Sequence, residues 1–237
     1  EMTYVPLHVH SEYSLLDGLS QASQISKRLN KIEIDTCALT DHGTVSGAVD
    51  FCRTFKGASQ KQILGCEFYL SEKDATEKSS ENRKLIHQVV LAKNLEGWKQ
   101  ILGLVSQSNH ADQFYYKPRI DFNQLREAAS SGNLISFSGH LGSYLGNIAL
   151  ENQSDSFICE AAHRLQNMFG RDNFFIEIQL IDSENNEGAR IVGERLRDIA
   201  KQANIPCVAT PDAHYPTREA AEDQRVLLCT SLKKTIG

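Results

Sequence analysis

The 237-residue sequence contains no apolar run that approaches the roughly 18 consecutive residues of a transmembrane helix. Its first ten residues, EMTYVPLHVH, also lack the basic and apolar regions of a secretory signal peptide. We therefore expect a cytoplasmic protein without a membrane partner.

Cysteine is present but is never arranged in a motif. The six cysteines are scattered, none belongs to a Cys-x-x-Cys pair, and several lie in apolar runs. This pattern argues against disulfides and against a thiolate zinc site, and it is typical of reduced cysteines in a protein core.

The sequence also lacks an excess of positive charge. Its 25 Lys and Arg residues against 30 Asp and Glu residues give a formal net charge of -5. The surface as a whole therefore does not favour a polyanion, and nucleic-acid binding must depend on a local patch or on bound cations.

Short β-branched or aromatic runs alternate with longer stretches of helical period, which is typical of repeated β-α units. The seven candidate strands are residues 4–10, 36–42, 63–70, 85–92, 133–139, 173–180 and 205–212. The candidate helices include residues 122–132, 162–170 and 188–204. The charged stretch 71–84 is expected to form a solvated surface loop.

The 41% hydrophobic composition suffices for one large core, so we expect a single α/β domain over residues 1–237. A mainly parallel sheet of seven strands can be open and doubly wound, or closed into a barrel. We favour the barrel because polar residues gather near the C-terminal ends of the predicted strands, where the site of a β/α barrel forms.

These polar residues are typical metal ligands. The candidates are His8, His10, Asp17, His42, Glu67, His87, His140, Asp212 and His214. Residues two apart on a strand face the same way, so His8 and His10 can reach one centre. Imidazoles with carboxylates suit zinc, manganese or iron. Nine ligands exceed what one tetrahedral ion can use, and multi-metal sites recur in phosphoester hydrolysis.

Several of these residues also have structural interpretations. Asp17 fits a turn equally well, and the spacing alone favours His87 as a core histidine near the beginning of its strand. Asp41 should point away from His42, so we expect it to cap the following helix. Glu67 lies in an apolar strand and needs a cation or several donors, because burying an unpaired carboxylate is costly.

Seven segments resemble a known family. They are HVHSEYSLLDG, ALTDHGTVSGAVDF, GCEFYL, HQVVLAKNLEGWKQILGLVS, YYKPRID, SFSGHLGS and VATPDAHY. In this order they resemble the PHP (polymerase and histidinol phosphatase) domain of bacterial DNA polymerase III alpha subunits. The resemblance spans nearly the whole chain and implies a distorted seven-stranded (β/α)7 TIM-like barrel. It also implies that His87 is a ligand.

The resemblance implies three divalent ions, Zn²⁺ or Mn²⁺, with iron as a further option. Their ligand sets would be His8, His10, Glu67 and Asp212; Glu67, His87 and His140; and Asp17, His42 and His214. One departure concerns His140, since that position is often cysteine in the polymerase branch. Either group binds zinc, so the change bears on metal preference.

The implied activity is a 3′–5′ proofreading exonuclease that acts on the 3′ end of DNA. Its catalytic residues would be His8, His10, Glu67, Asp212 and His214. Lys117 and Arg119 are candidate phosphate contacts, although a loop-anchoring salt bridge explains them equally well. The chain would be an N-terminal fragment that contacts the remaining polymerase domains and other replisome subunits. Two alternatives stay open: a metal-stabilised scaffold that cuts nothing, and a small-molecule phosphatase of the histidinol-phosphate type.

Overall fold

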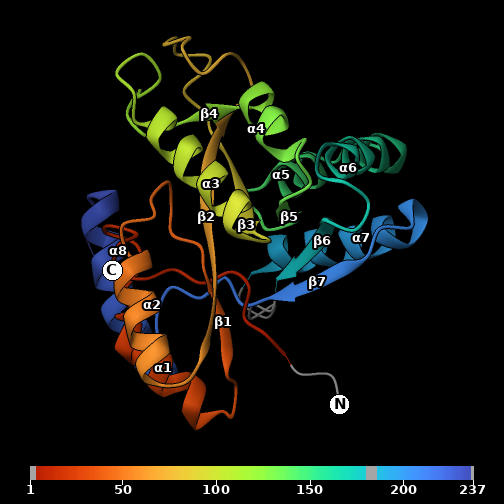
Figure 1. The fold of residues 1–237 in the computed structure, drawn as a ribbon. Coiled ribbons are helices and arrows are strands. Elements are labelled where there is room, and N and C mark those ends of the chain that lie inside the picture. Colours follow the sequence, from red (N-terminus) through yellow and green to blue (C-terminus); the bar gives the residue numbers. More distant parts are fainter. Residues whose placement is uncertain (1–3, 180–185, 236–237) are drawn as a thin grey trace.

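The computed structural model describes residues 4–179 and 186–235, which form one strongly curled sheet with helices around it (Figure 1). The strands are β1 (Thr36–Leu39), β2 (Lys61–Ser71), β3 (Ile86–Ala92), β4 (Ile120–Asp121), β5 (Leu134–Ser138), β6 (Phe174–Gln179) and β7 (Cys207–Thr210). The helices are α1 (Ala22–Lys31), α2 (Ala48–Gly57), α3 (Leu95–Ser108), α4 (Phe122–Ala129), α5 (Tyr144–Leu150), α6 (Asp155–Phe169), α7 (Glu187–Ala203) and α8 (Ala221–Leu232), with a 3₁₀ turn at Arg218–Ala220.

The strand order is β1-β2-β3-β5-β6-β7, with β4 paired to β2. Most neighbours are parallel, but β3 is antiparallel to both β2 and β5. The predicted α/β fold with a curled, seven-stranded sheet is confirmed for the described residues, and the reversed direction of β3 is an addition to it.

The predicted strand 4–10 is an extended segment and not a regular strand. It forms a single parallel bridge, between Val9 and Ala213. Its backbone nonetheless joins the two edges of the sheet. On one side the amides of Ala38 and Thr40 donate to this segment at 2.9 Å, and on the other His10 N donates to Ala213 O at 2.8 Å. The segment therefore closes the gap between β1 and the residues after β7.

The other predicted elements differ mainly at their ends. Residue 180 of the predicted strand 173–180 lies outside the described residues. The short strand β4 is the one that the sequence pattern did not predict. The helix predicted over 122–132 ends at Ala129, and Gly132 then adopts the left-handed backbone conformation with φ of 74°. The stretch 71–84 forms an exposed loop after β2, as expected.

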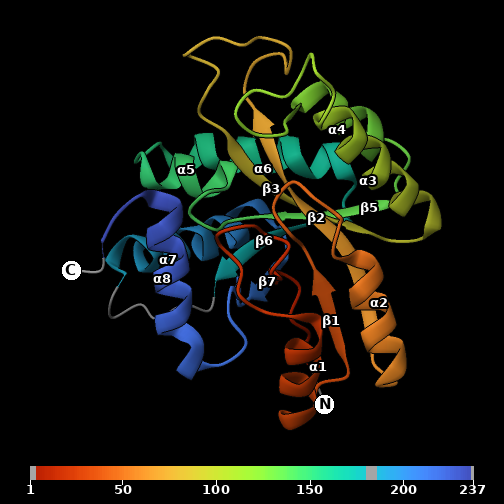
Figure 2. The same ribbon diagram turned by 90° about the vertical axis from the view of Figure 1, so that its left-hand side faces the viewer.

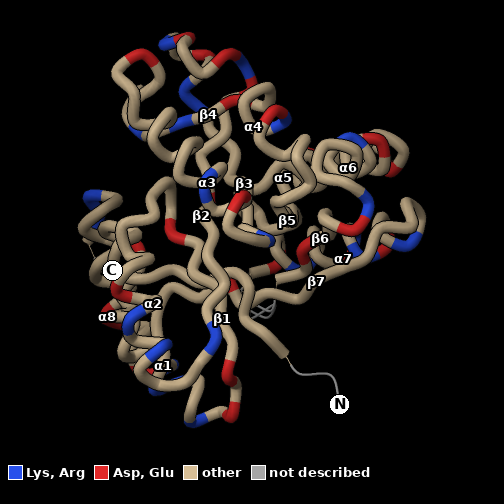
Figure 3. Tube along the Cα trace, in the orientation of Figure 1, with Lys and Arg blue, Asp and Glu red and all other residues tan. Residues whose placement is uncertain are grey.

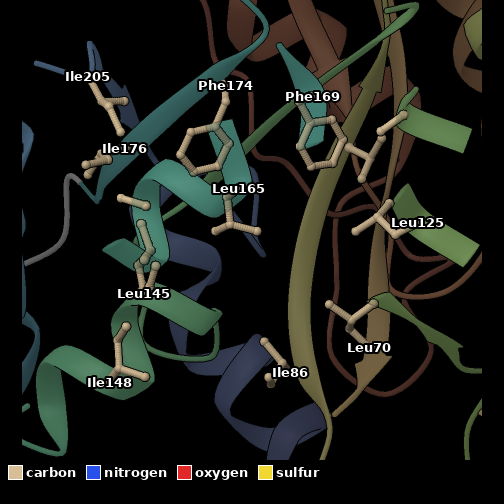
Figure 4. Close-up of a cluster of buried hydrophobic side chains, with 14 of the residues drawn as sticks. Leu70, Ile86, Leu125, Leu145, Ile148, Leu165, Phe169, Phe174, Ile176 and Ile205 are labelled. Carbon is tan, nitrogen blue, oxygen red and sulfur yellow. The ribbon is translucent and has the colours of Figure 1, made fainter. Parts of the chain in front are cut away.

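The largest core lies between the sheet and helices α3 to α7. Figure 4 shows side chains from strands and helices meeting there, among them Leu70 of β2, Leu165 of α6 and Phe174 of β6. A fully buried side chain of this kind contributes about 1.5–3 kcal/mol. A second cluster joins α1 and α2 to β1, and a third, around Val89 and Phe137, lies inside the curled sheet.

The elements around this sheet set the surroundings of the candidate site. In Figure 2 the turn of residues 11–19 lies between α8 and β1, and Gln224 of α8 donates to the carbonyl of Asp17 at 3.0 Å. Figure 3 shows Lys and Arg interspersed with Asp and Glu, as expected from the composition. In the described residues, none of the helices combines the length and apolar character that a bilayer crossing needs.

Candidate metal centre

The site begins with the segment that closes the sheet. His8 and His10 are both fully buried, and their ring centroids lie 5.1 Å apart. Because the segment is extended, residues two apart face the same side. Both rings therefore point into the curled sheet, as predicted from the His-x-His spacing.

Glu67 of β2 occupies the centre of the site and is almost fully buried. Its Oε2 atom lies 2.9 Å from both His8 Nε2 and His10 Nε2 and 3.4 Å from His42 Nδ1. Its Oε1 atom lies 2.9 Å from His87 Nδ1 and from His140 Nε2. Burial alone would raise the pKa of Glu67, but His42, His8 and His140 hold it well below its usual value. One carboxylate thus faces five imidazoles.

The direction of β3 explains why His87 joins this group. The parallel strands carry their polar residues at their C-terminal ends, whereas β3 runs the other way. Its first residues therefore lie at the same rim of the sheet. The interpretation of His87 as a core histidine, made from spacing alone, assumed a parallel strand and was wrong about its surroundings.

A second group lies at the mouth of the site. Asp17 Oδ2 is 2.9 Å from His42 Nε2 and 3.2 Å from His214 Nε2. The His10 ring stacks on both His42 and His214, with centroid distances of 4.2 Å to each. Burial would raise the pKa of Asp17, but His214 and His42 hold it well below the ordinary range. The side chains of Asp17, His42 and His214 are partly exposed, so the site opens to solvent here.

Asp212 joins the two groups. Its Oδ1 atom lies 3.2 Å from His8 Nε2 and 3.3 Å from His10 Nε2, while Oδ2 accepts a 2.6 Å hydrogen bond from Gln179. Its φ angle of 44° is in the left-handed region, which is sparsely populated outside glycine. The backbone at Asp212 is thus held in a strained conformation that presents the carboxylate to two imidazoles.

One structural observation indicates that these residues suit a metal centre. Among the described residues, four buried atoms have no hydrogen-bond partner although other ligand atoms lie close to them. They are His10 Nε2, His42 Nδ1, His140 Nε2 and Asp212 Oδ1. Ligand atoms that converge in this way without hydrogen-bonding one another are placed to bind a shared cation. The sets His8–His10–Glu67–Asp212 and His42–Glu67–His87 each bring their ligand atoms within 4.8 Å of one another.

The prediction for Asp41 was wrong. Its buried carboxylate accepts 2.7 Å hydrogen bonds from the Ser11 amide and from the Ser11 and Ser14 hydroxyls. The helix that follows begins after Gly47, so Asp41 is too far away to cap it. The carboxylate instead holds the turn of residues 11–14.

The two candidate phosphate contacts lie in different surroundings. Arg119 is fully buried and donates to the carbonyls of Asn82 and Tyr115 at 2.6 Å, so it anchors the adjoining loops. Its partners are carbonyl groups and not the carboxylate of a salt bridge. Lys117 donates to the Tyr69 hydroxyl at 3.1 Å and lines a cavity beside the metal centre.

This cavity has a volume of about 960 Å³ and an aromatic and apolar rim. Asp17 and His42 line it together with Tyr13, Leu15, Tyr116 and Lys117. Tyr116 is 64% exposed, and the guanidinium of Arg83 lies 4.2 Å above its ring. The site is therefore open to a ligand larger than a water molecule.

Sequence reasoning missed Glu177, a fully buried carboxylate on β6. It lies 2.6 Å from His8 Nδ1 and 2.8 Å from His140 Nδ1. The signal was present, because Glu177 stands in the apolar run NFFIEIQL just as Glu67 stands in ILGCEFYL. The argument that singled out Glu67 applies equally to Glu177.

Comparison with known proteins identifies a matching family. The PHP domain family model matches residues 6–180. DNA polymerase III subunit alpha of Treponema pallidum is 34% identical over 98% of this chain, and that of Borreliella burgdorferi is 36% identical over 98%. The chain spans about a fifth of the length of these relatives, 20% in both cases.

Two solved structures share the fold at low sequence identity. A proposed metal-dependent phosphoesterase from Bifidobacterium adolescentis aligns with a TM-score of 0.55 at 12% identity, covering 90% of this chain and 88% of its own. An amidohydrolase from Chromobacterium violaceum aligns with a TM-score of 0.56 at 13% identity, covering 94% and 96%. With the family model matched over most of the sequence, the chain belongs to the PHP domain family.

Proposed function

We propose that the chain is the metal-dependent phosphoesterase domain of a DNA polymerase III alpha subunit and acts as a 3′–5′ proofreading exonuclease. The observation that carries the proposal is the convergence of nine candidate ligands with Glu67 at their centre, in which four buried ligand atoms lack hydrogen-bond partners among the described residues. Polymerase alpha subunits are the relatives that match nearly the full chain.

Three ions would use the nine side chains in three sets. The sets are His8, His10, Glu67 and Asp212; Glu67, His87 and His140; and Asp17, His42 and His214. When bound, divalent ions of the zinc or manganese type supply Lewis acidity that activates water and stabilises charge on phosphoryl oxygens. The identity of the ions is left to metal analysis.

The protein's own residues position the substrate. Lys117 lies at the cavity beside Asp17 and His42, where its ammonium group can contact a phosphate oxygen. The exposed ring of Tyr116 offers a face on which an unpaired base can stack. A strand end with unpaired bases uses both features, whereas a small phosphomonoester needs only the first.

Partners and location follow from the same proposal. The domain would contact the remaining polymerase domains, the 3′ end of DNA and other replisome subunits in the cytoplasm. Figure 3 shows that the charges of both signs are mixed, so DNA would be held locally by the bound cations and Lys117.

The proposal is tested by the Asp212→Asn variant. With Mn²⁺ or Zn²⁺, the wild-type protein should remove nucleotides from 3′-labelled single-stranded and mismatched DNA. Asp212→Asn should reduce this rate by roughly 100-fold or more, since outer partners of metal ligands already contribute 10–100-fold. Gel analysis of the labelled products measures the rate.

Asp172→Asn is the matched control, because this exposed carboxyl precedes β6 outside the site. Its rate should equal that of the wild type. Nucleotide release that survives Asp212→Asn would contradict the proposal. Turnover of only a small phosphomonoester would point to the phosphatase, and metal binding without any turnover would point to the scaffold.

A further inference from the structure

Glu177 is a buried carboxylate that contacts the Nδ1 atoms of two histidines, on the side of each ring that faces away from Glu67. Its Oε1 atom lies 2.6 Å from His8 Nδ1 and accepts a 2.6 Å hydrogen bond from the Thr210 hydroxyl. Its Oε2 atom lies 2.8 Å from His140 Nδ1. One side chain thus joins two imidazoles that are far apart in the sequence.

These bonds fix which ring nitrogen faces the centre. A carboxylate accepts hydrogen bonds, so the Nδ1 atoms of His8 and His140 carry the protons that are donated to it. The Nε2 atoms are on the other side of each ring, 2.9 Å from Glu67. A metal ligand needs a free lone pair, and in this arrangement the lone pair of each neutral ring is on Nε2.

The local backbone is built to bring Glu177 close to His140. A Cβ atom at Gly139 would lie 1.9 Å from the carbonyl oxygen of Glu177, so only glycine permits this approach. The neighbouring His140 then reaches the side chain of the same glutamate. Thr210 of β7 supports the carboxylate from the adjacent strand.

Glu177, His8 and His140 lie close enough together to bind a metal ion themselves. If Glu177 were a ligand, however, it would lose its contacts with both imidazoles and its hydrogen bond from Thr210. The unpartnered atom of His140 is Nε2, which faces Glu67 and not Glu177. The contacts therefore favour an orienting role for Glu177 over a ligand role.

We infer that Glu177 is a positioning residue that holds His8 and His140 with Nε2 directed at the metal centre. The inference rests on the proposed metal centre and adds to it a residue that determines two of its ligands. Loss of Glu177 should therefore weaken metal binding even when no substrate is present.

Glu177→Gln tests the inference while keeping the size of the side chain. The amide can accept from one imidazole, but its NH₂ group must donate to the other. The Nδ1 atom of that second ring must then accept, so its proton moves to Nε2, where it blocks metal binding. The affinity of the 237-residue protein for Zn²⁺ should fall roughly 10–100-fold, measured by competition with a chelator.

Thr210→Val is the matched control, since it removes one hydrogen bond to Glu177 and leaves the carboxylate in place. Its Zn²⁺ affinity should fall less than that of Glu177→Gln, because both imidazoles keep a carboxylate that accepts from Nδ1. Far-ultraviolet circular dichroism of each metal-free variant verifies that it is folded.

A second measurement reads the protonated ring nitrogens directly, starting with the wild-type protein. In the wild-type protein loaded with Zn²⁺ and labelled with ¹⁵N-histidine, His8 and His140 should each show a protonated Nδ1 and a metal-bound Nε2 in NMR spectra. Glu177→Gln should lose one of these two signatures.

Unchanged Zn²⁺ affinity of a folded Glu177→Gln protein, or metal bound through Nδ1 in the wild type, would overturn the role of Glu177. Either result leaves the metal centre itself intact. Failure of the wild-type protein to bind Zn²⁺ would instead remove the proposed function together with this inference, so the two failures are distinguishable.

Discussion

Glu67→Gln is expected to remove most of the bound metal and to abolish phosphoester hydrolysis. The carboxylate lies 2.9 Å from four imidazole nitrogens and belongs to two of the proposed ligand sets. A neutral amide supplies one oxygen in place of two and no charge, so two ions lose a shared ligand. We expect hydrolysis to fall by more than the roughly 10–100-fold effect of an outer partner. Metal content after gel filtration and the rate of 3′-end release measure both effects.

Glu72→Gln makes the same substitution on an exposed carboxyl just after β2 and should change neither quantity. The larger effect of Glu67→Gln must therefore come from the site and not from the net charge. A Glu67→Gln protein that retains the full wild-type complement of metal would refute the bridging role.

Removal of the metal is expected to make the protein unstable at alkaline pH. Burial opposes the charged form of both rings, but Asp212 and Glu67 raise the pKa of His10 to about 9, and Glu177 and Glu67 raise the pKa of His140 to about 10. A histidine with a raised pKa stabilises the folded state fully below its unfolded pKa of about 6.5. This contribution is lost as the pH rises through the folded pKa values, so stability should decline between about pH 6.5 and 10.

His42 differs, since burial lowers its pKa to about 4 despite the opposing charge of Glu67. His42 therefore lowers the stability of the folded protein only below about pH 6.5. It leaves the decline at alkaline pH unchanged. We expect the melting temperature of the chelator-treated protein to fall on the order of 10 °C over this range, because about 1 kcal/mol corresponds to 2–4 °C in a chain of this size. Scanning calorimetry at a series of pH values measures the change.

Saturating Zn²⁺ should reverse this dependence. The imidazoles must release protons to bind the metal, so affinity rises with pH. Each ion present at about 1,000 times its dissociation constant adds roughly 4 kcal/mol to the free energy of unfolding. His140→Gln should reduce the alkaline decline of the metal-free protein, whereas the exposed His110→Gln should not. A metal-free protein whose stability is constant from pH 6.5 to 10 would contradict the account.

Local patterns predicted most of the sheet and its mainly parallel course, but not the reversed direction of β3. Runs of β-branched and aromatic residues located β1, β2, β3, β5, β6 and β7 to within a few residues. The antiparallel course of β3 depends on packing across the sheet, and no run of residues encodes it. His87 shows the consequence, because its position in the strand favoured a core histidine, whereas the antiparallel course of β3 places it beside Glu67.

The extended segment 4–10 illustrates a second limit. Its composition is typical of a strand, and His8, Val9 and His10 are buried as residues of an inner strand would be. Its backbone, however, meets different partners on its two sides and makes only one regular bridge. Composition reports which face of a segment is buried, whereas regular pairing depends on neighbours far away in the sequence.

The candidate site was largely predictable because burying a charge requires a partner. The structure brings Glu67, Asp212 and the imidazoles of the His-x-His pair into one cluster. The same argument could have found Glu177. Asp41 and Arg119 show the limit of this reasoning, because the sequence does not reveal which partner a buried charge has. Their charges are satisfied by serine hydroxyls and backbone carbonyls, yet in the sequence they look the same as metal ligands.

The most direct test of the metal centre is elemental analysis of the 237-residue protein purified without chelator. The three ligand sets predict about three divalent ions per chain, of the zinc, manganese or iron type. Less than one ion per chain, even after incubation with Mn²⁺ and Zn²⁺ and removal of the excess, would contradict the account.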